Sequence, residues 1–71
     1  NVSASVGNHC IINSKALIEH NAVIEDYCHI STAAVINGGS IVRQDSFVGS
    51  NSTTKEYIEI KGFIKAGELK K

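Results

Sequence analysis

The sequence predicts an all-β fold built from very short strands that recur every six residues. Read in sixes from Asn1, eight consecutive blocks end in valine or isoleucine, and a small side chain stands two residues before each of these aliphatics. An amphipathic helix would repeat every 3.6 residues and cannot maintain a period of six. A plain strand alternates every two residues, which fits locally but does not account for regular corners.

The eight blocks cover residues 1–48 without a miss: NVSASV, GNHCII, NSKALI, EHNAVI, EDYCHI, STAAVI, NGGSIV and RQDSFV. Their final aliphatics are Val6, Ile12, Ile18, Ile24, Ile30, Ile36, Val42 and Val48. The small residues are Ala4, Cys10, Ala16, Ala22, Cys28, Ala34, Ser40 and Ser46. The residue after each aliphatic tends to be small, polar or acidic, as at a turn.

This hexad resembles the hexapeptide repeat of the left-handed parallel β-helix. The resemblance implies that three hexads form one triangular coil, with the aliphatic inward and the small residue near a corner. The left-handed crossover is an exception to the usual rule for parallel strands, and it follows from the resemblance, not from the period. Residues separated by three hexads would then stack at the spacing of paired strands, about 4.8 Å. Cys10 would stack on Cys28 at an α-carbon separation compatible with a disulfide, but parallel side chains would keep the β-carbons too far apart. Both cysteines are therefore expected to be buried thiols that act as small interior fillers.

After residue 48 the register loosens, and the next three blocks end in Thr54, Ile60 and Ala66. Residues 49–66 are therefore expected to form a last, irregular coil, because Tyr57 and Phe63 are too bulky for a narrow interior. Residues 67–71, GELKK, are expected to form a charged end that shields an open strand edge. The predicted domain, residues 1–66, has about three to four coils, and so small a core favours an oligomer. The chain opens in mid-pattern without methionine, so we expect a fragment of a longer protein.

Composition excludes several classes of partner. Seven basic and seven acidic residues give no net charge and no basic stripe, so nucleic acid is not expected. No apolar run approaches the roughly 18–20 residues of a membrane span, and no signal peptide is visible. Two cysteines without secretory features suggest reduced thiols and a cytoplasmic location.

The three histidines fall outside the inward positions of the repeat. His20 is placed at a corner and His29 on the outer face of a strand, whereas His9 has no supporting motif. Solvated surface histidines, or for His29 a subunit contact, are the plain alternatives. The gamma-class carbonic anhydrases, which share the β-helix, bind zinc through three histidines, two of them close in sequence. Here the spacings are eleven and nine, so no metal site is expected.

Residues 12–52 resemble the acetyltransferases of bacterial sialic acid and bacillosamine metabolism, which transfer an acetyl group from acetyl-CoA to a sugar. The matching segments are IEHNAVI at 18–24, HISTAA at 29–34 and the glycine pair Gly38-Gly39. The resemblance implies a homotrimer with active sites between chains, and an N-terminal domain for the nucleotide sugar that is missing from this chain. It also implies a role for each of five residues: His20 as general base, His29, Ser50 and Ala66 as acetyl-CoA contacts, and the Gly38 N–H as donor to the thioester oxygen.

These roles agree with the chemistry of acyl transfer. The reaction needs a base that works near pH 7, which suits histidine, and a fixed N–H aimed at the developing oxyanion. Gly38 follows His20 by three hexads, so the coil places it next to the base, although a simple corner turn would also explain the glycine. Asn21 stands where the family has Glu or Asp; an amide can orient an imidazole but cannot stabilise its cation. Glu19 or Glu25 would then have to compensate.

The expected function is therefore acetyl-CoA-dependent O- or N-acetylation of a small-molecule sugar or nucleotide sugar by direct transfer. Neither Cys10 nor Cys28 is placed as a nucleophile, because both point into the core. The alternative is a non-catalytic β-helical trimerisation or scaffold domain. An ice-binding solenoid would need a Thr-x-Thr ladder at the coil period, which this sequence lacks.

Overall fold

The computed structural model describes residues 3–71, so the first two residues of the predicted domain 1–66 lie outside the described part of the chain. It contains twelve two-residue strands: β1 Ser5–Val6, β2 Ile11–Ile12, β3 Leu17–Ile18, β4 Val23–Ile24, β5 His29–Ile30, β6 Val35–Ile36, β7 Ile41–Val42, β8 Phe47–Val48, β9 Thr53–Thr54, β10 Glu59–Ile60, β11 Phe63–Ile64 and β12 Leu69–Lys70. Within residues 3–71 no helical segment has the length and apolar character of a membrane span.

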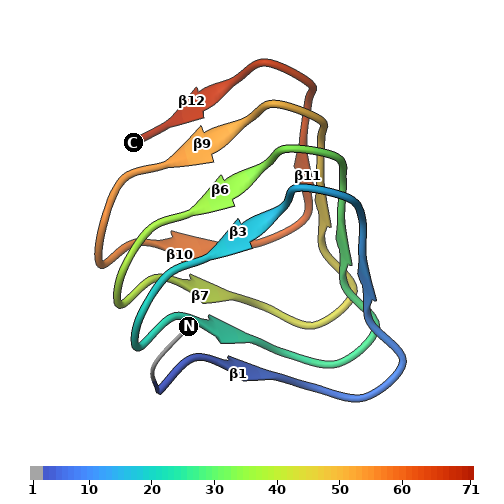
Figure 1. The fold of residues 1–71 in the computed structure, drawn as a ribbon, viewed down its shortest axis with the longest axis vertical. Coiled ribbons are helices and arrows are strands. Elements are labelled where there is room, and N and C mark those ends of the chain that lie inside the picture. The colour runs from blue at the N-terminus through green and yellow to red at the C-terminus, as the bar shows by residue number, and fades with distance from the viewer. Residues whose placement is uncertain (1–2) are drawn as a thin grey trace.

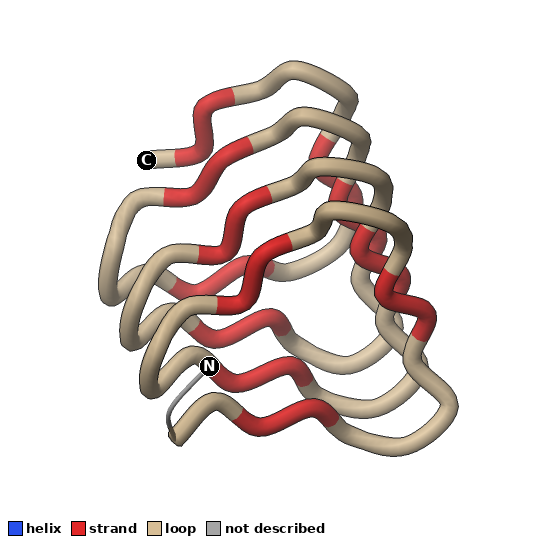
Figure 2. The backbone as a smooth tube through the Cα atoms, in the orientation of Figure 1, coloured by secondary structure: helices blue, strands red, loops and turns tan. Residues whose placement is uncertain are grey.

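The strands stack into three parallel sheets that form the sides of a triangular coil (Figure 1). Their orders are β1-β4-β7-β10, β11-β8-β5-β2 and β12-β9-β6-β3. Figure 2 shows the strands in three columns separated by turns. The chain is therefore a parallel β-solenoid of about four turns, which confirms the all-β repeat fold. The left-handed crossover stays a prediction.

Successive coils stay in register, three hexads apart, through most of the chain. Val23 pairs with Ser5 on one side and with Ile41 on the other. Amides of each coil donate to carbonyls of the next, as from Leu17 N–H to the Ala34 oxygen at 2.8 Å. Because this spacing equals three hexads, the sequence period gives the coil length directly.

The last coil is shorter than predicted. Phe63 pairs with Phe47, sixteen residues earlier, because only Lys61 and Gly62 separate β10 from β11. Gly62 has φ 91°, a backbone conformation that glycine adopts without steric cost. The expectation that Ala66 ends the final block was wrong: Ile64 takes the buried inward position and Ala66 is exposed.

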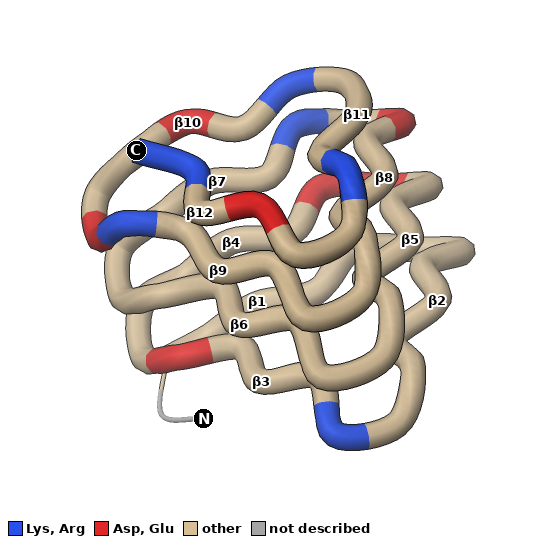
Figure 3. The backbone as a smooth tube through the Cα atoms, turned by 90° about the horizontal axis from the view of Figure 1, so that it is seen from above, with Lys and Arg blue, Asp and Glu red and all other residues tan. Residues whose placement is uncertain are grey.

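The C-terminal residues belong to the solenoid itself. Leu69–Lys70 form β12, which pairs with Thr53–Thr54 of β9 and so covers that strand edge as part of the sheet. Lysines gather on this last coil (Figure 3). They are Lys55, Lys61, Lys65, Lys70 and Lys71. Charged residues on a terminal strand disfavour pairing with another chain, and shielding of this edge by GELKK stays a prediction.

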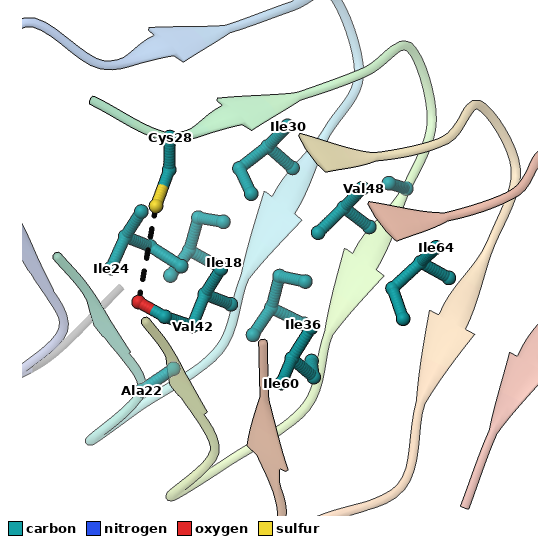
Figure 4. Packing of buried hydrophobic residues seen from close by; sticks show 11 residues of the cluster. Ile18, Ala22, Ile24, Cys28, Ile30, Ile36, Val42, Val48, Ile60 and Ile64 are labelled. Carbon is teal, nitrogen blue, oxygen red and sulfur yellow. Dashed lines mark hydrogen bonds between the residues drawn. The ribbon is translucent and has the colours of Figure 1, made fainter. Parts of the chain in front are cut away.

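The core is a single column of inward aliphatics packed along the coil axis (Figure 4). From the second coil onward these side chains are buried, whereas Val6 and Ile12 of the first coil are exposed at its open end. The predicted inward orientation of the repeat is therefore confirmed.

The small residues of the repeat also satisfy backbone carbonyls. The thiol of Cys10 donates to the Glu25 oxygen at 3.1 Å and that of Cys28 to the Arg43 oxygen at 3.1 Å. Both cysteines are free thiols, and burial raises the pKa of Cys28, which favours the protonated, donating form. The hydroxyl of Ser40 makes the same contact with the next coil. Cysteine and serine thus supply a donor as well as a small volume.

The third residue of each hexad turns the corner in the left-handed region of backbone space. In order these residues are Ser3, His9, Lys15, Asn21, Tyr27, Ala33, Gly39, Asp45, Asn51 and Tyr57. Glycine, asparagine and aspartate tolerate this conformation best. Asn21 therefore has a backbone role at its corner, whatever its side chain does.

Candidate functional site

The first group of predicted site residues lies at one corner of the solenoid. This His20 corner consists of residues 19–22, 37–40 and 55–58, which stack on successive coils between the β3-containing and β1-containing sheets (Figure 1). A Cβ placed on Gly38 would lie 3.1 Å from Cε1 and 3.5 Å from Nδ1 of His20. The imidazole therefore rests against the bare backbone of Gly38, the contact that their separation by one full coil predicts.

The backbone amide of Gly38 is a candidate donor beside this imidazole. Residue 38 is buried, and within residues 3–71 its N–H donates to no acceptor. At an adjacent corner two of the three equivalent amides are capped by carboxylates. There the Asn8 N–H donates to Asp26 at 2.8 Å, and the Gln44 N–H donates to Glu25 at 3.0 Å. Like most amides at this repeat position, the Gly38 N–H thus has no acceptor within residues 3–71.

Asn21 is exposed and has φ 60°, and among the described residues its amide makes no hydrogen bond to His20. Glu25 does not compensate for it. The Glu25 carboxylate lies at the next corner, where it accepts a hydrogen bond from Arg43 at 3.0 Å. Arg43 also binds Glu59 at 2.7 Å, and this hydrogen bond lowers the pKa of the Glu59 carboxyl.

His29 lies on a different side of the molecule, on the outer face of β5. Its ring is partly buried and meets Phe47 edge-on, with ring centroids 5.0 Å apart. The amide nitrogen of Asn13 lies 3.2 Å from Nε2 of His29. Together, the contacts with Phe47 and Asn13 hold the His29 ring in one orientation.

Ser50 and Ala66 come together at a third corner. The Gly67 N–H donates to the Ser50 oxygen at 2.9 Å, and a Cβ on Gly49 would lie 2.5 Å from the Ala66 nitrogen. This corner adjoins the sheet that carries His29, whereas the His20 corner lies opposite that sheet (Figure 2). One chain thus holds the predicted residues in two groups on opposite sides.

Tyr57 is a residue of the His20 corner that the sequence did not single out as functional. Its ring lies over Gly39, where an added Cβ would overlap Cδ1 and Cε1 of the ring. The sequence contained a signal for this contact, because Tyr57 follows Gly39 by one coil of three hexads.

The third histidine, His9, lies at another corner and stacks on Tyr27 at 5.2 Å. Across residues 3–71 no group of three or more His, Cys, Asp or Glu side chains could hold a metal ion.

Comparison of the chain with protein-family models, with curated proteins and with solved structures gives no match. Any functional assignment therefore depends on the repeat, the coil geometry and the chemistry of the side chains. The contact between His20 and Gly38 is the most specific of these observations, because it joins a base to a stretch of backbone that carries no side chain.

Proposed function

We propose that this chain is a left-handed hexapeptide-repeat acetyltransferase domain that uses acetyl-CoA to acetylate an oxygen or nitrogen of a sugar or nucleotide sugar. The observation that carries the proposal is the contact between the His20 imidazole and Gly38. In this role His20 takes the proton from the acceptor hydroxyl or amine as that group attacks the acetyl carbon. The N–H of Gly38 donates to the carbonyl oxygen as negative charge develops there. Acetyl-CoA supplies the activated acetyl group.

We further propose that the protein acts as a homotrimer. His29, Ser50 and Ala66 would then contact acetyl-CoA from the chain that neighbours the one supplying His20 and Gly38. The separation of the two groups within one chain supports this arrangement. The outer face of the His29 sheet is also apolar, with Ile11 and Phe63 exposed, and such faces commonly mark subunit contacts. The free thiols of both cysteines suit a reducing, cytoplasmic location.

A non-catalytic trimerisation or scaffold domain is the second candidate. It is favoured by Asn21, which replaces the expected acid and, in the described part of the chain, makes no hydrogen bond to His20. Without a carboxylate partner, the imidazolium formed during transfer is less stabilised. The repeat would be retained for assembly while the chemistry was lost.

Calorimetric titration of acetyl-CoA separates the two candidates. The protein is first shown by sedimentation to be trimeric and is then compared with His29→Ala and, as a matched control, His9→Ala. We expect saturable binding that His29→Ala weakens and His9→Ala leaves unchanged, because His9 lies at a corner that holds none of the proposed acetyl-CoA contacts. A trimer that does not bind acetyl-CoA, or a stable monomer at micromolar concentration, would contradict the proposal.

A transfer assay tests the base independently. His20→Ala should retain acetyl-CoA binding while the transfer rate to an amino or hydroxyl sugar falls by about 10²–10⁴-fold, the usual contribution of a general base. His20→Gln serves as a second variant that keeps a polar side chain at the corner. An unchanged rate in both variants would exclude His20 as the base.

A further inference from the structure

Tyr57 stands apart from the other aromatic residues of the chain. The chain has two tyrosines and two phenylalanines. Three of these rings are paired with another ring: Tyr27 with His9, Phe47 with both His29 and Phe63, and Phe63 with Phe47. Within residues 3–71 the ring of Tyr57 has no such partner and is 77% exposed. An aromatic face of this size is therefore open at the surface.

The backbone under Tyr57 is adapted to its ring. Gly39 has φ 72°, and any side chain there would overlap Cδ1 and Cε1 of Tyr57. The Cδ1–Cε1 edge of the ring thus lies against glycine backbone, while most of the side chain stays exposed. The Tyr57 N–H also donates to the Gly38 oxygen at 3.0 Å, which ties residue 57 to the same corner.

Two rings consequently lie on adjacent glycine residues. His20 comes from the preceding coil and rests on Gly38, and Tyr57 comes from the following coil and rests on Gly39. The α-carbons of adjacent residues are about 3.8 Å apart. A molecule that reaches the imidazole of His20 over this glycine pair therefore meets the ring of Tyr57 next to it.

We propose that Tyr57 binds the acceptor sugar, whose apolar C–H face stacks on the phenol ring while a hydroxyl or amine points to His20. This assignment rests on the proposed function, since it places the acceptor at the proposed base. A tyrosine ring provides apolar contact area together with a hydroxyl that can exchange a hydrogen bond with a sugar hydroxyl. Ligand sites commonly combine an aromatic wall with a few convergent polar groups in this way.

Tyrosine fluorescence can locate the sugar, because the chain has no tryptophan and only two tyrosines. Tyr27→Phe leaves Tyr57 as the only tyrosine, and Tyr57→Phe leaves Tyr27, with a ring retained in both cases. The probes are glucosamine, N-acetylglucosamine and N-acetylneuraminic acid at millimolar concentration. We expect at least one probe to change the emission of Tyr27→Phe saturably and to leave that of Tyr57→Phe unchanged. Equal changes in both variants, or no saturable change with any probe, would overturn the proposal.

Affinity provides the second readout. Loss of one stacked ring should weaken sugar binding about two- to tenfold, measured by saturation-transfer NMR of the sugar protons in Tyr57→Ala. Tyr27→Ala is the matched control, since Tyr27 also occupies a third hexad position at an exposed corner. Alanine is compatible with that position, because Ala33 already occupies one with φ 60°. Equal affinity in Tyr57→Ala and Tyr27→Ala would contradict the assignment.

The calorimetry of acetyl-CoA keeps this inference distinguishable from the proposed function. If acetyl-CoA binds, His29→Ala weakens that binding and the Tyr57 variants do not change sugar binding, the acetyltransferase proposal stands and the acceptor binds elsewhere. If a sugar binds at Tyr57 but acetyl-CoA does not bind the trimer, the corner is a sugar site without transfer chemistry.

Discussion

Replacing Ile30 by alanine should destabilise the fold strongly. Ile30 is 0% exposed and stacks between Ile12 of the first coil and Val48 of the third. The change removes three carbon groups, and at about 0.8 kcal/mol for each buried group the lost transfer energy is about 2.4 kcal/mol. The narrow interior cannot collapse around the gap, so a cavity contribution brings the expected loss to about 3–4 kcal/mol.

Ile12→Ala is the matched control, because it makes the same chemical change at the same repeat position one coil earlier. Ile12 is 39% exposed at the open end of the solenoid, so about three-fifths of its side chain is buried. The expected loss is then about 1.5 kcal/mol, and no closed cavity forms. The two variants should therefore differ by about 2 kcal/mol in the free energy of unfolding.

Thermal unfolding at one fixed chain concentration measures this difference, since assembly makes the midpoint depend on concentration. For a domain of this size 1 kcal/mol shifts the midpoint by about 4–8 °C, so the midpoints should differ by about 8–16 °C. Equal losses in Ile30→Ala and Ile12→Ala would refute the reasoning. They would mean that the first coil is covered in solution and that its exposed inward side chains are part of a core.

Two further predictions concern the last coil and the ion pairs. Gly49→Ala should destabilise the protein by about 1–3 kcal/mol in denaturant unfolding, because its Cβ would meet the Ala66 nitrogen at 2.5 Å and backbone cannot move aside cheaply; unchanged stability would place the shortened coil elsewhere. The hydrogen bond from Arg43 holds the pKa of Glu59 below its ordinary value of 4.5, so the stability it contributes is present above pH 4.5 and is lost as pH falls through the lower, folded pKa. Unfolding followed across that acidic range should show a smaller pH dependence in Glu59→Gln, and the difference should shrink in high salt because both groups are exposed.

The regular part of the fold could be predicted because one physical constraint repeats. An interior this narrow accepts an aliphatic side chain every six residues and a small side chain near each corner. The spacing of Ile24, Ile30 and Ile36 therefore predicts both where the strands lie and which of their residues point inward. The hydrogen-bonding role of Cys10 and Cys28 was not predicted. It depends on which carbonyl of the next coil lies within reach of the sulfur, and a one-dimensional pattern does not contain that distance.

The last coil was mispredicted because the period of six was carried too far. Ile60 and Ile64 are four residues apart, and Gly62 between them allows a corner of two residues. This aliphatic spacing, together with the glycine, was a readable signal of a shortened coil. The consequence is local: Ala66 moves to an exposed corner beside Ser50, while the earlier coils retain their register.

At the candidate site the period of the repeat predicted which residues are neighbours on adjacent coils. It did not predict the conformations of their side chains. The neighbouring placement of His20 and Gly38 follows from their separation by three hexads alone. The fold of the Tyr57 ring back onto Gly39, and the contact of Asn13 with His29, depend on rotamers that the sequence pattern does not specify. The separation of His20 from His29 could have been predicted from the coil. His20 is the second residue of its hexad and lies at a corner, whereas His29 is the fifth residue of the next hexad and lies on the opposite side of the triangle.

A solenoid makes every corner alike, so a functional site has to be sought where the repeat is broken. The second position of the hexad forms the outer edge of each corner, and in the described repeat its occupants are Asn8, Ser14, His20, Asp26, Thr32, Gly38, Gln44, Ser50 and Glu56. Only Gly38 among them lacks a side chain, and it lies one coil beyond the only histidine in the set. Where Asp26 holds this position, its carboxylate caps the amide of the preceding coil, which stabilises the turn and removes a donor. The His20 corner has instead an imidazole over backbone without a side chain, and we propose that this departure from the repeat marks the site, since most other second-position amides also have no acceptor in residues 3–71.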